Sequence, residues 1–67
     1  MIYLTKQQRK ALKHIWDRKV NEQQPEDVPT YKEFRKTVQP ELCGDGAVMV
    51  HSAGMWIGIE TDGYRHT

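Results

Sequence analysis

The sequence predicts a small α+β domain in which two helices pack on one face of a three-stranded antiparallel sheet, in the order helix-helix-strand-strand-strand. Two patterns indicate this fold class. Apolar residues recur with a helical period of about 3.6 residues in the first half of the chain, and they alternate with a period of two in the last third. The chain has 67 residues, which is enough for a single domain over residues 1–67.

The first helix is expected within residues 1–21. Thr5 followed by Gln8 has the sequence of a capping box, and no Gly or Pro occurs between residues 6 and 21. Residues 1–4 are expected either to add an edge strand or to rest on the core. The core-facing stripe of this helix consists of Gln8, Ala11, Leu12, Ile15 and the stem of Lys19.

The second helix is expected to be short. Residues 22–29 are polar, acidic and twice interrupted by proline, which predicts a loop. A second capping box, Thr30 with Glu33, predicts a helix over residues 30–38 that Pro40 ends. Its inward-facing side chains are Tyr31, Phe34 and Val38.

Residues 46–67 predict a β-meander, which follows a turn at residues 44–46. The face toward the helices is expected to carry Val48, Val50, Met55, Ile57 and Ile59. The outer face is expected to carry Met49, His51, Trp56, Gly58 and Glu60. A large aromatic side chain, Trp56, is therefore predicted on the outside of the sheet.

The register follows from keeping the two faces distinct. An even-numbered loop around residues 52–54 pairs Val50 with Ile57, whereas a three-residue loop would mix the faces. Four loop residues are preferred to two, because Ala-Gly fits poorly into the turns of two-residue hairpins. In the second hairpin, Asp62-Gly63 predicts a two-residue turn that places Glu60 opposite Arg65.

Composition limits the class of protein. A hydrophobic fraction of 37% and a formal charge of +1 lie within the globular range. The single cysteine, Cys43, cannot form an intramolecular disulfide, which favours a reducing, cytosolic compartment. No apolar run is long enough for a signal peptide or a membrane span, so no membrane association is expected.

Two stretches carry a resemblance. "TYKEFRKTVQP" over residues 30–40 and "GMWIGIETDGY" over residues 54–64, followed by His66, resemble a group of short proteins encoded by tailed bacteriophages and prophages. The resemblance spans residues 4–66. It implies a phage origin and a place in the host cell cytoplasm or in the virion. That group has no established activity to carry over; the resemblance favours a stoichiometric role, as an inhibitor of a host factor or defence system or as a small virion component.

The outer sheet face is the first candidate site. Trp56 with Met49 and His51 is typical of a protein-binding surface, and Gly58 beside the indole leaves a notch. A second candidate lies at the border of the first helix, at Trp16 and Val20. Two interpretations of Trp56 stay open: a binding residue on an exposed face, or a core residue beneath a helix or the N-terminal segment.

A basic stripe on the first helix is the alternative site. Residues 1–38 carry a balance of +4 and residues 39–67 a balance of −3. The stripe could bind nucleic acid through phosphates, or it could be a solvated face with Lys13 near Asp17. The small total charge and the acidic sheet favour the solvated face. The stripe consists of Lys6, Arg9, Lys10 and Lys13.

No motif predicts catalysis, a metal or a cofactor. The possible zinc ligands lack the close spacing of zinc sites, and a Cys43–His51–Asp45 nucleophilic set lacks a pocket in so small a domain. The expected function is therefore non-catalytic binding of a protein partner. Self-association through the outer sheet face stays open. The possible zinc ligands are His14, Cys43, His51 and His66.

Overall fold

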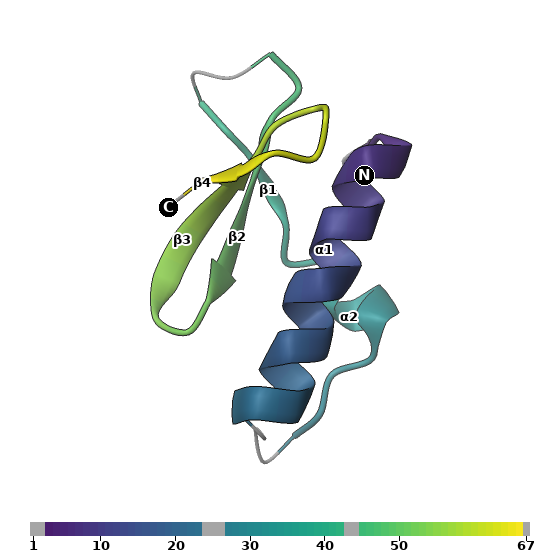
Figure 1. The fold of residues 1–67 in the computed structure, drawn as a ribbon, viewed down its shortest axis with the longest axis vertical. Coiled ribbons are helices and arrows are strands. Elements are labelled where there is room, and N and C mark those ends of the chain that lie inside the picture. Colours follow the sequence, from purple (N-terminus) through teal and green to yellow (C-terminus); the bar gives the residue numbers. More distant parts are fainter. Residues whose placement is uncertain (1–2, 24–26, 43–44, 67) are drawn as a thin grey trace.

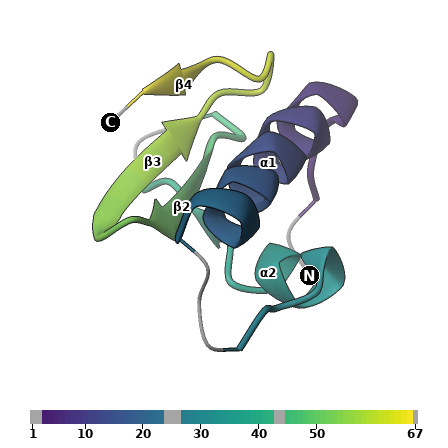
Figure 2. The same ribbon diagram turned by 60° about the horizontal axis from the view of Figure 1, so that its bottom comes forward.

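The computed structural model describes residues 3–23, 27–42 and 45–66. A helical layer lies on one side of an antiparallel sheet, which confirms the α+β class (Figure 1; Figure 2). The helical layer consists of α1 (Lys6–Arg18), a π-helical turn η1 (Lys19–Gln23) and α2 (Tyr31–Arg35). The sheet consists of β1 (Gln39–Pro40), β2 (Val48–Ser52), β3 (Met55–Ile59) and β4 (Arg65–His66).

Helix α1 begins at the predicted capping box. The Thr5 hydroxyl oxygen accepts a hydrogen bond from the Gln8 amide at 3.1 Å, and the Gln8 side chain accepts one from the Thr5 amide at 2.9 Å. Thr5 also donates its hydroxyl proton to the Thr61 carbonyl oxygen at 2.7 Å. The cap therefore joins the start of α1 to the loop between β3 and β4, in addition to satisfying helix amides.

Helix α2 has the predicted capping box but is shorter than predicted. The Thr30 hydroxyl accepts from the Glu33 amide at 3.1 Å, and the helix ends at Arg35 instead of residue 38. A turn follows, in which the Thr37 hydroxyl donates to the Phe34 carbonyl at 2.7 Å. Val38 is buried as predicted, although it lies beyond the helix.

The sheet has four strands in the order β1-β2-β3-β4, not three. The additional strand is β1, whose Gln39 and Pro40 pair with Met49 and Val48. Pro40 was predicted only to end a helix, but an edge strand accepts a proline at a position whose amide would face solvent. The Glu41 amide, which donates to the Ala47 carbonyl at 3.0 Å, extends this pairing.

The β2–β3 register is the one predicted, with Val50 opposite Ile57 and His51 opposite Trp56. The predicted four-residue loop is wrong, because Ser52 pairs with Met55 and leaves only Ala53 and Gly54 between them. Both loop residues have positive φ, +54° and +74°, as a type I′ turn requires. The left-handed alanine costs about 1 kcal/mol, which the matched twist of the two strands outweighs.

The β3–β4 register differs from the prediction by one residue. Ile59, not Glu60, lies opposite Arg65, and Gly58 lies opposite His66. The Gly63 amide donates to the Glu60 carbonyl at 2.9 Å, and the Glu60 amide donates to the Tyr64 carbonyl at 2.9 Å. With Gly63 at a φ of +88°, these bonds form a three-residue loop with a glycine bulge instead of the predicted two-residue turn.

The core lies between α1, α2 and the inner sheet face. The N-terminal segment was expected either to add an edge strand or to rest on the core. In its described part, Leu4 is buried in the core and forms no strand, so it rests on the core. Ile57 is half-buried at its edge. Met55 lies on the same sheet face as Ile57, as predicted, but it is 49% exposed next to the β2–β3 turn. The buried core residues are Leu4, Ala11, Leu12, Ile15, Phe34, Val38, Val48, Val50 and Ile59.

We expect Thr5→Ala to lower the free energy of unfolding by about 2 kcal/mol and Thr30→Ala by about 1 kcal/mol. Both substitutions remove a cap acceptor, but only Thr5 also bonds another element, at Thr61. Urea denaturation measures both losses, with Thr5→Ser, which keeps the hydroxyl, as the control near wild type. A larger loss at Thr30 than at Thr5 would show that the bond to Thr61 contributes nothing to stability.

Candidate functional site

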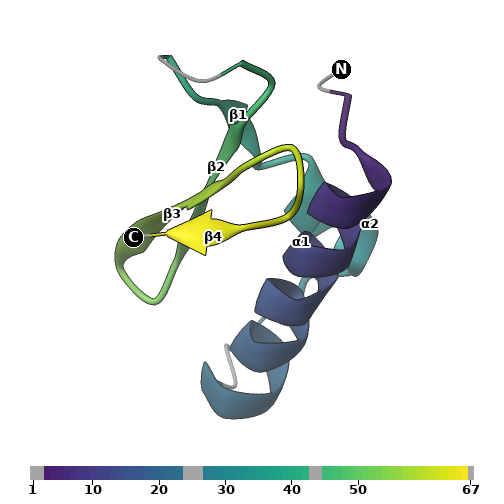
Figure 3. The ribbon, with the colours of Figure 1, turned by 45° about the horizontal axis from the view of Figure 1, so that its top comes forward.

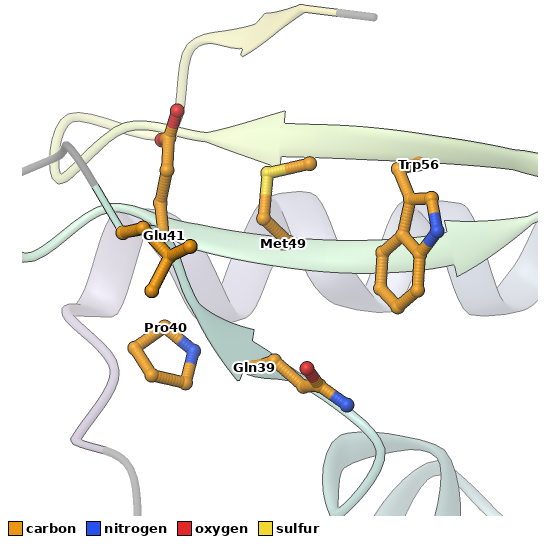
Figure 4. Close-up of a pocket in the computed structure, with 6 residues that line it drawn as sticks. Gln39, Pro40, Glu41, Met49 and Trp56 are labelled. Carbon is orange, nitrogen blue, oxygen red and sulfur yellow. The ribbon is translucent and has the colours of Figure 1, made fainter.

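The sheet face that points away from the helices carries the candidate site. Figure 4 shows side chains of β1, β2 and β3 on this side of the sheet, with α1 behind it. Strand pairing arranges them in rows, of which His51–Trp56 and Gln39–Met49–Gly58–His66 are two. We call this surface the outer face. It carries Gln39, Glu41, Ala47, Met49, His51, Trp56, Gly58, Glu60, Tyr64 and His66.

Trp56 is 49% exposed on the outer face, so it is not a core residue beneath a helix. The His51 ring meets the indole edge-to-face, with 5.1 Å between ring centroids. Met49 lies half-buried on the same face (Figure 4), and Leu42 is fully exposed. Trp56 is thus held by neighbours on one side and open to solvent on the other.

These side chains line a groove of about 360 Å³ (Figure 4). One wall is the indole of Trp56, and Met49 lies at the middle of the floor. The groove is apolar except for the Gln39 amide and the Glu41 carboxylate at its edges. An apolar groove with a polar rim is the usual form of a small protein-binding site. Its lining consists of Gln39, Pro40, Glu41, Leu42, Met49 and Trp56.

The notch predicted at Gly58 is filled by this chain. A Cβ atom added to Gly58 would lie 2.8 Å from Cε1 of His66, so the imidazole rests on the glycine backbone. Gly58 is accordingly buried. The predicted notch is absent because the observed β3–β4 register differs by one residue from the predicted one and places His66 opposite Gly58.

Trp16 and Val20 do not join the outer face. The Trp16 indole N–H donates to the Pro29 carbonyl at 2.8 Å, and its ring meets Tyr31 edge-to-face at 6.1 Å between centroids. The indole therefore fastens the segment before α2 onto α1, and it packs against the core. Val20 is half-buried in η1. Sequence spacing correctly placed Trp16 at a border but could not identify its partner.

The basic stripe lies on the solvent side of α1. Lys6, Arg9, Lys10 and Lys13 are all exposed, on the side opposite the buried residues of the helix. In the described part of the chain the ion pairs are Arg18–Glu22 at 3.5 Å and Glu60–His66 at 3.1 Å, so the expected Lys13–Asp17 pair is not formed. The four cations are thus open to solvent.

The histidines considered as zinc ligands are dispersed. His14 lies exposed on α1, whereas His51 and His66 lie in different rows of the outer face. Cys43 lies outside the described residues. The structure instead brings together His66, Glu41 and Glu60, whose ligand atoms lie within 4.8 Å of one another. No sequence motif marks this cluster, since its members come from both edges of the sheet.

Comparison of the chain with protein-family models, with curated proteins and with solved structures found no match. No described helix is both long enough and apolar enough to cross a membrane.

Proposed function

We propose that this chain is a non-catalytic protein that acts by stoichiometric binding of a protein partner through the outer-face groove. The observation that carries the proposal is the position of Trp56, which is half-exposed beside Met49 on a sheet face that the helices leave uncovered. With the phage origin that the sequence resemblance implies, the partner is a host protein in the bacterial cytoplasm or another component of the virion.

The groove has the composition of an interface centre. Trp and Met are enriched where partners bury apolar surface, and a Trp anchor typically contributes about 2 kcal/mol or more to binding. The His51 ring already restricts the indole, which reduces the side-chain entropy lost when a partner covers it. The fully exposed Leu42 adds another apolar side chain to the lining of the groove.

Nucleic-acid binding through the basic stripe is the alternative. The four exposed cations on one side of α1 favour it, because they form no ion pair with any described residue and are therefore available to phosphates. The whole chain carries only +1, however, and the balance of −3 over residues 39–67 repels a polyanion. Protein binding is therefore the better supported of the two functions.

We expect Trp56→Ser to abolish retention of the partner while the protein stays folded. About half of the indole is already exposed, so its loss lowers the free energy of unfolding by only about 1–2 kcal/mol. The measurement is quantitative affinity capture from lysate of the host bacterium, with a thermal melt of each bait. Tyr3→Ser is the matched control, since it removes another exposed aromatic outside the groove.

Three results would contradict the proposal. Trp56→Ser could capture the same proteins in the same amounts as the wild type, which would remove the groove from the interface. Tyr3→Ser could lose the partner equally, which would mean that any exposed aromatic suffices. Captured material could consist of nucleic acid that is released by moderate salt and by Lys10→Gln/Lys13→Gln, which would favour the alternative.

A further inference from the structure

Three potential metal ligands converge on the outer face at the end away from Trp56. They are Glu41, which follows β1, Glu60, which follows β3, and His66 in β4. One ligand atom from each lies within 4.8 Å of those from the other two. The residues are 19 and six positions apart in the sequence, so only the folded sheet assembles them.

Two small residues beneath the cluster make this convergence possible. Ala47, which directly precedes β2, lies in one cross-strand row with Glu41 and Glu60. The Glu41 amide donates to the Ala47 carbonyl, and the β2–β3 register, continued by one residue from Val48 opposite Ile59, places Ala47 opposite Glu60. Ala47 is only 2% exposed, yet it is not part of the core beneath the helices. Gly58 gives similar room to the His66 ring.

The Glu41 carboxylate provides a second, independent observation. Its Oε2 atom is shielded from solvent and has no hydrogen-bond partner among the described residues. The Glu60 carboxylate, in contrast, has a partner: its Oε1 lies 3.1 Å from Nε2 of His66, within the distance of a hydrogen bond or an ion pair. A shielded carboxylate oxygen without a donor is destabilising, and a bound cation is one of the few ways to satisfy it.

We propose that Glu41, Glu60 and His66 form a site for one divalent transition-metal ion, of which Zn²⁺ is the best fit. One imidazole nitrogen and two carboxylate oxygens are ligand types that zinc accepts, with water in the fourth position. Ligand atoms bound at about 2.1 Å in a tetrahedron lie about 3.4 Å apart. The His66–Glu60 separation of 3.1 Å is already close to that value, and small side-chain rotations bring in Glu41.

The ion would link opposite edges of the sheet. Glu41 belongs to the edge formed by β1 and His66 to the edge formed by β4, and each of these strands has only two residues. Because metal binds the folded chain and not the dispersed ligands of the unfolded one, it raises the melting temperature. This proposal does not depend on the protein-binding function.

The test is titration of metal-free protein with ZnCl₂ by calorimetry, together with thermal melts with and without Zn²⁺. We expect one Zn²⁺ per chain and an increase of several degrees in the melting temperature. Glu41→Gln and His66→Gln, which keep side-chain size, should each weaken the affinity at least tenfold. His14→Gln and Cys43→Ser are the controls, and both should bind Zn²⁺ like the wild type.

Metal-free melts establish that Glu41→Gln and His66→Gln are folded before binding is compared. A Co²⁺ spectrum of the wild type adds a readout of ligand type, and it should lack the sulfur-to-metal charge-transfer band of a thiolate site. The proposal is overturned by a wild type that does not bind Zn²⁺, by binding that survives both ligand substitutions, or by binding that Cys43→Ser removes.

Discussion

Replacing Gln8 with leucine is expected to lower the free energy of unfolding by about 3–5 kcal/mol, enough to unfold most of so small a domain. Gln8 is 1% exposed, although it is polar. Its side-chain nitrogen donates to the Gly46 carbonyl at 2.8 Å and to the Ile59 carbonyl at 3.3 Å, and its oxygen accepts from the Thr5 amide. One side chain thus bonds the start of α1 to the segment before β2 and to the end of β3.

Leucine has nearly the volume of glutamine, so the loss reports the hydrogen bonds and not a cavity. The bond to the Ile59 carbonyl is buried, so its loss costs about 1–3 kcal/mol, and the part-buried bonds to the Gly46 carbonyl and from the Thr5 amide add smaller losses. Chemical denaturation measures the loss, with Gln7→Ala as the control at the exposed neighbouring position. If Gln8→Leu were as stable as the wild type, the packing of α1 on the sheet would depend on apolar contacts alone.

Gln8 also shows how far the sequence alone could be interpreted. The capping-box pattern and the helical period placed it both at the start of α1 and on the core-facing stripe. Its bonds to Gly46 and Ile59 could not be predicted, because they depend on how α1 lies across the sheet. Local patterns define an element and its buried side, whereas long-range partners require the packed structure.

The strand registers could also be predicted only in part from the sequence. The β2–β3 register was predictable because a slip of one residue would expose the apolar face. The β1 and β4 strands lack that constraint, since each has two residues and both are exposed. Strand β1 was consequently missed, and the β4 register was predicted one residue away from its observed position.

This one-residue shift in the β4 register decides which side chains lie on the outer face. In the predicted register, Arg65 would lie opposite Glu60 on the outer face and His66 would point to the inner face. In the observed register His66 lies opposite Gly58 and reaches Glu60 at 3.1 Å. Alternation along β3 was therefore enough to place Trp56 on the outer face, but its exposure there was settled only by the packed structure. The cluster of Glu41, Glu60 and His66 required strand β1 and the β4 register, which the sequence left undetermined.

The loop between β3 and β4 leads to the second large effect, at Gly63. This loop reaches the first turn of α1 (Figure 3). Gly63 has a φ of +88°, and a Cβ atom added there would lie 3.0 Å from the Gln7 carbonyl oxygen and 3.3 Å from its carbonyl carbon. Valine at this position would meet helix backbone, which cannot rotate away as a side chain can. It would also adopt a left-handed conformation that β-branched residues avoid.

We expect Gly63→Val to lower the free energy of unfolding by about 3–4 kcal/mol, from left-handed strain and the steric contact together. Gly54→Val is the matched control, because Gly54 has a similar φ of +74° but nothing within 4 Å of the added Cβ. It should lose only the strain, about 1–2 kcal/mol. Urea denaturation of both variants isolates the contact as the difference between them. Equal losses would mean that the β3–β4 loop does not rest on α1, and the bond from Thr5 to Thr61 would then be absent in solution as well.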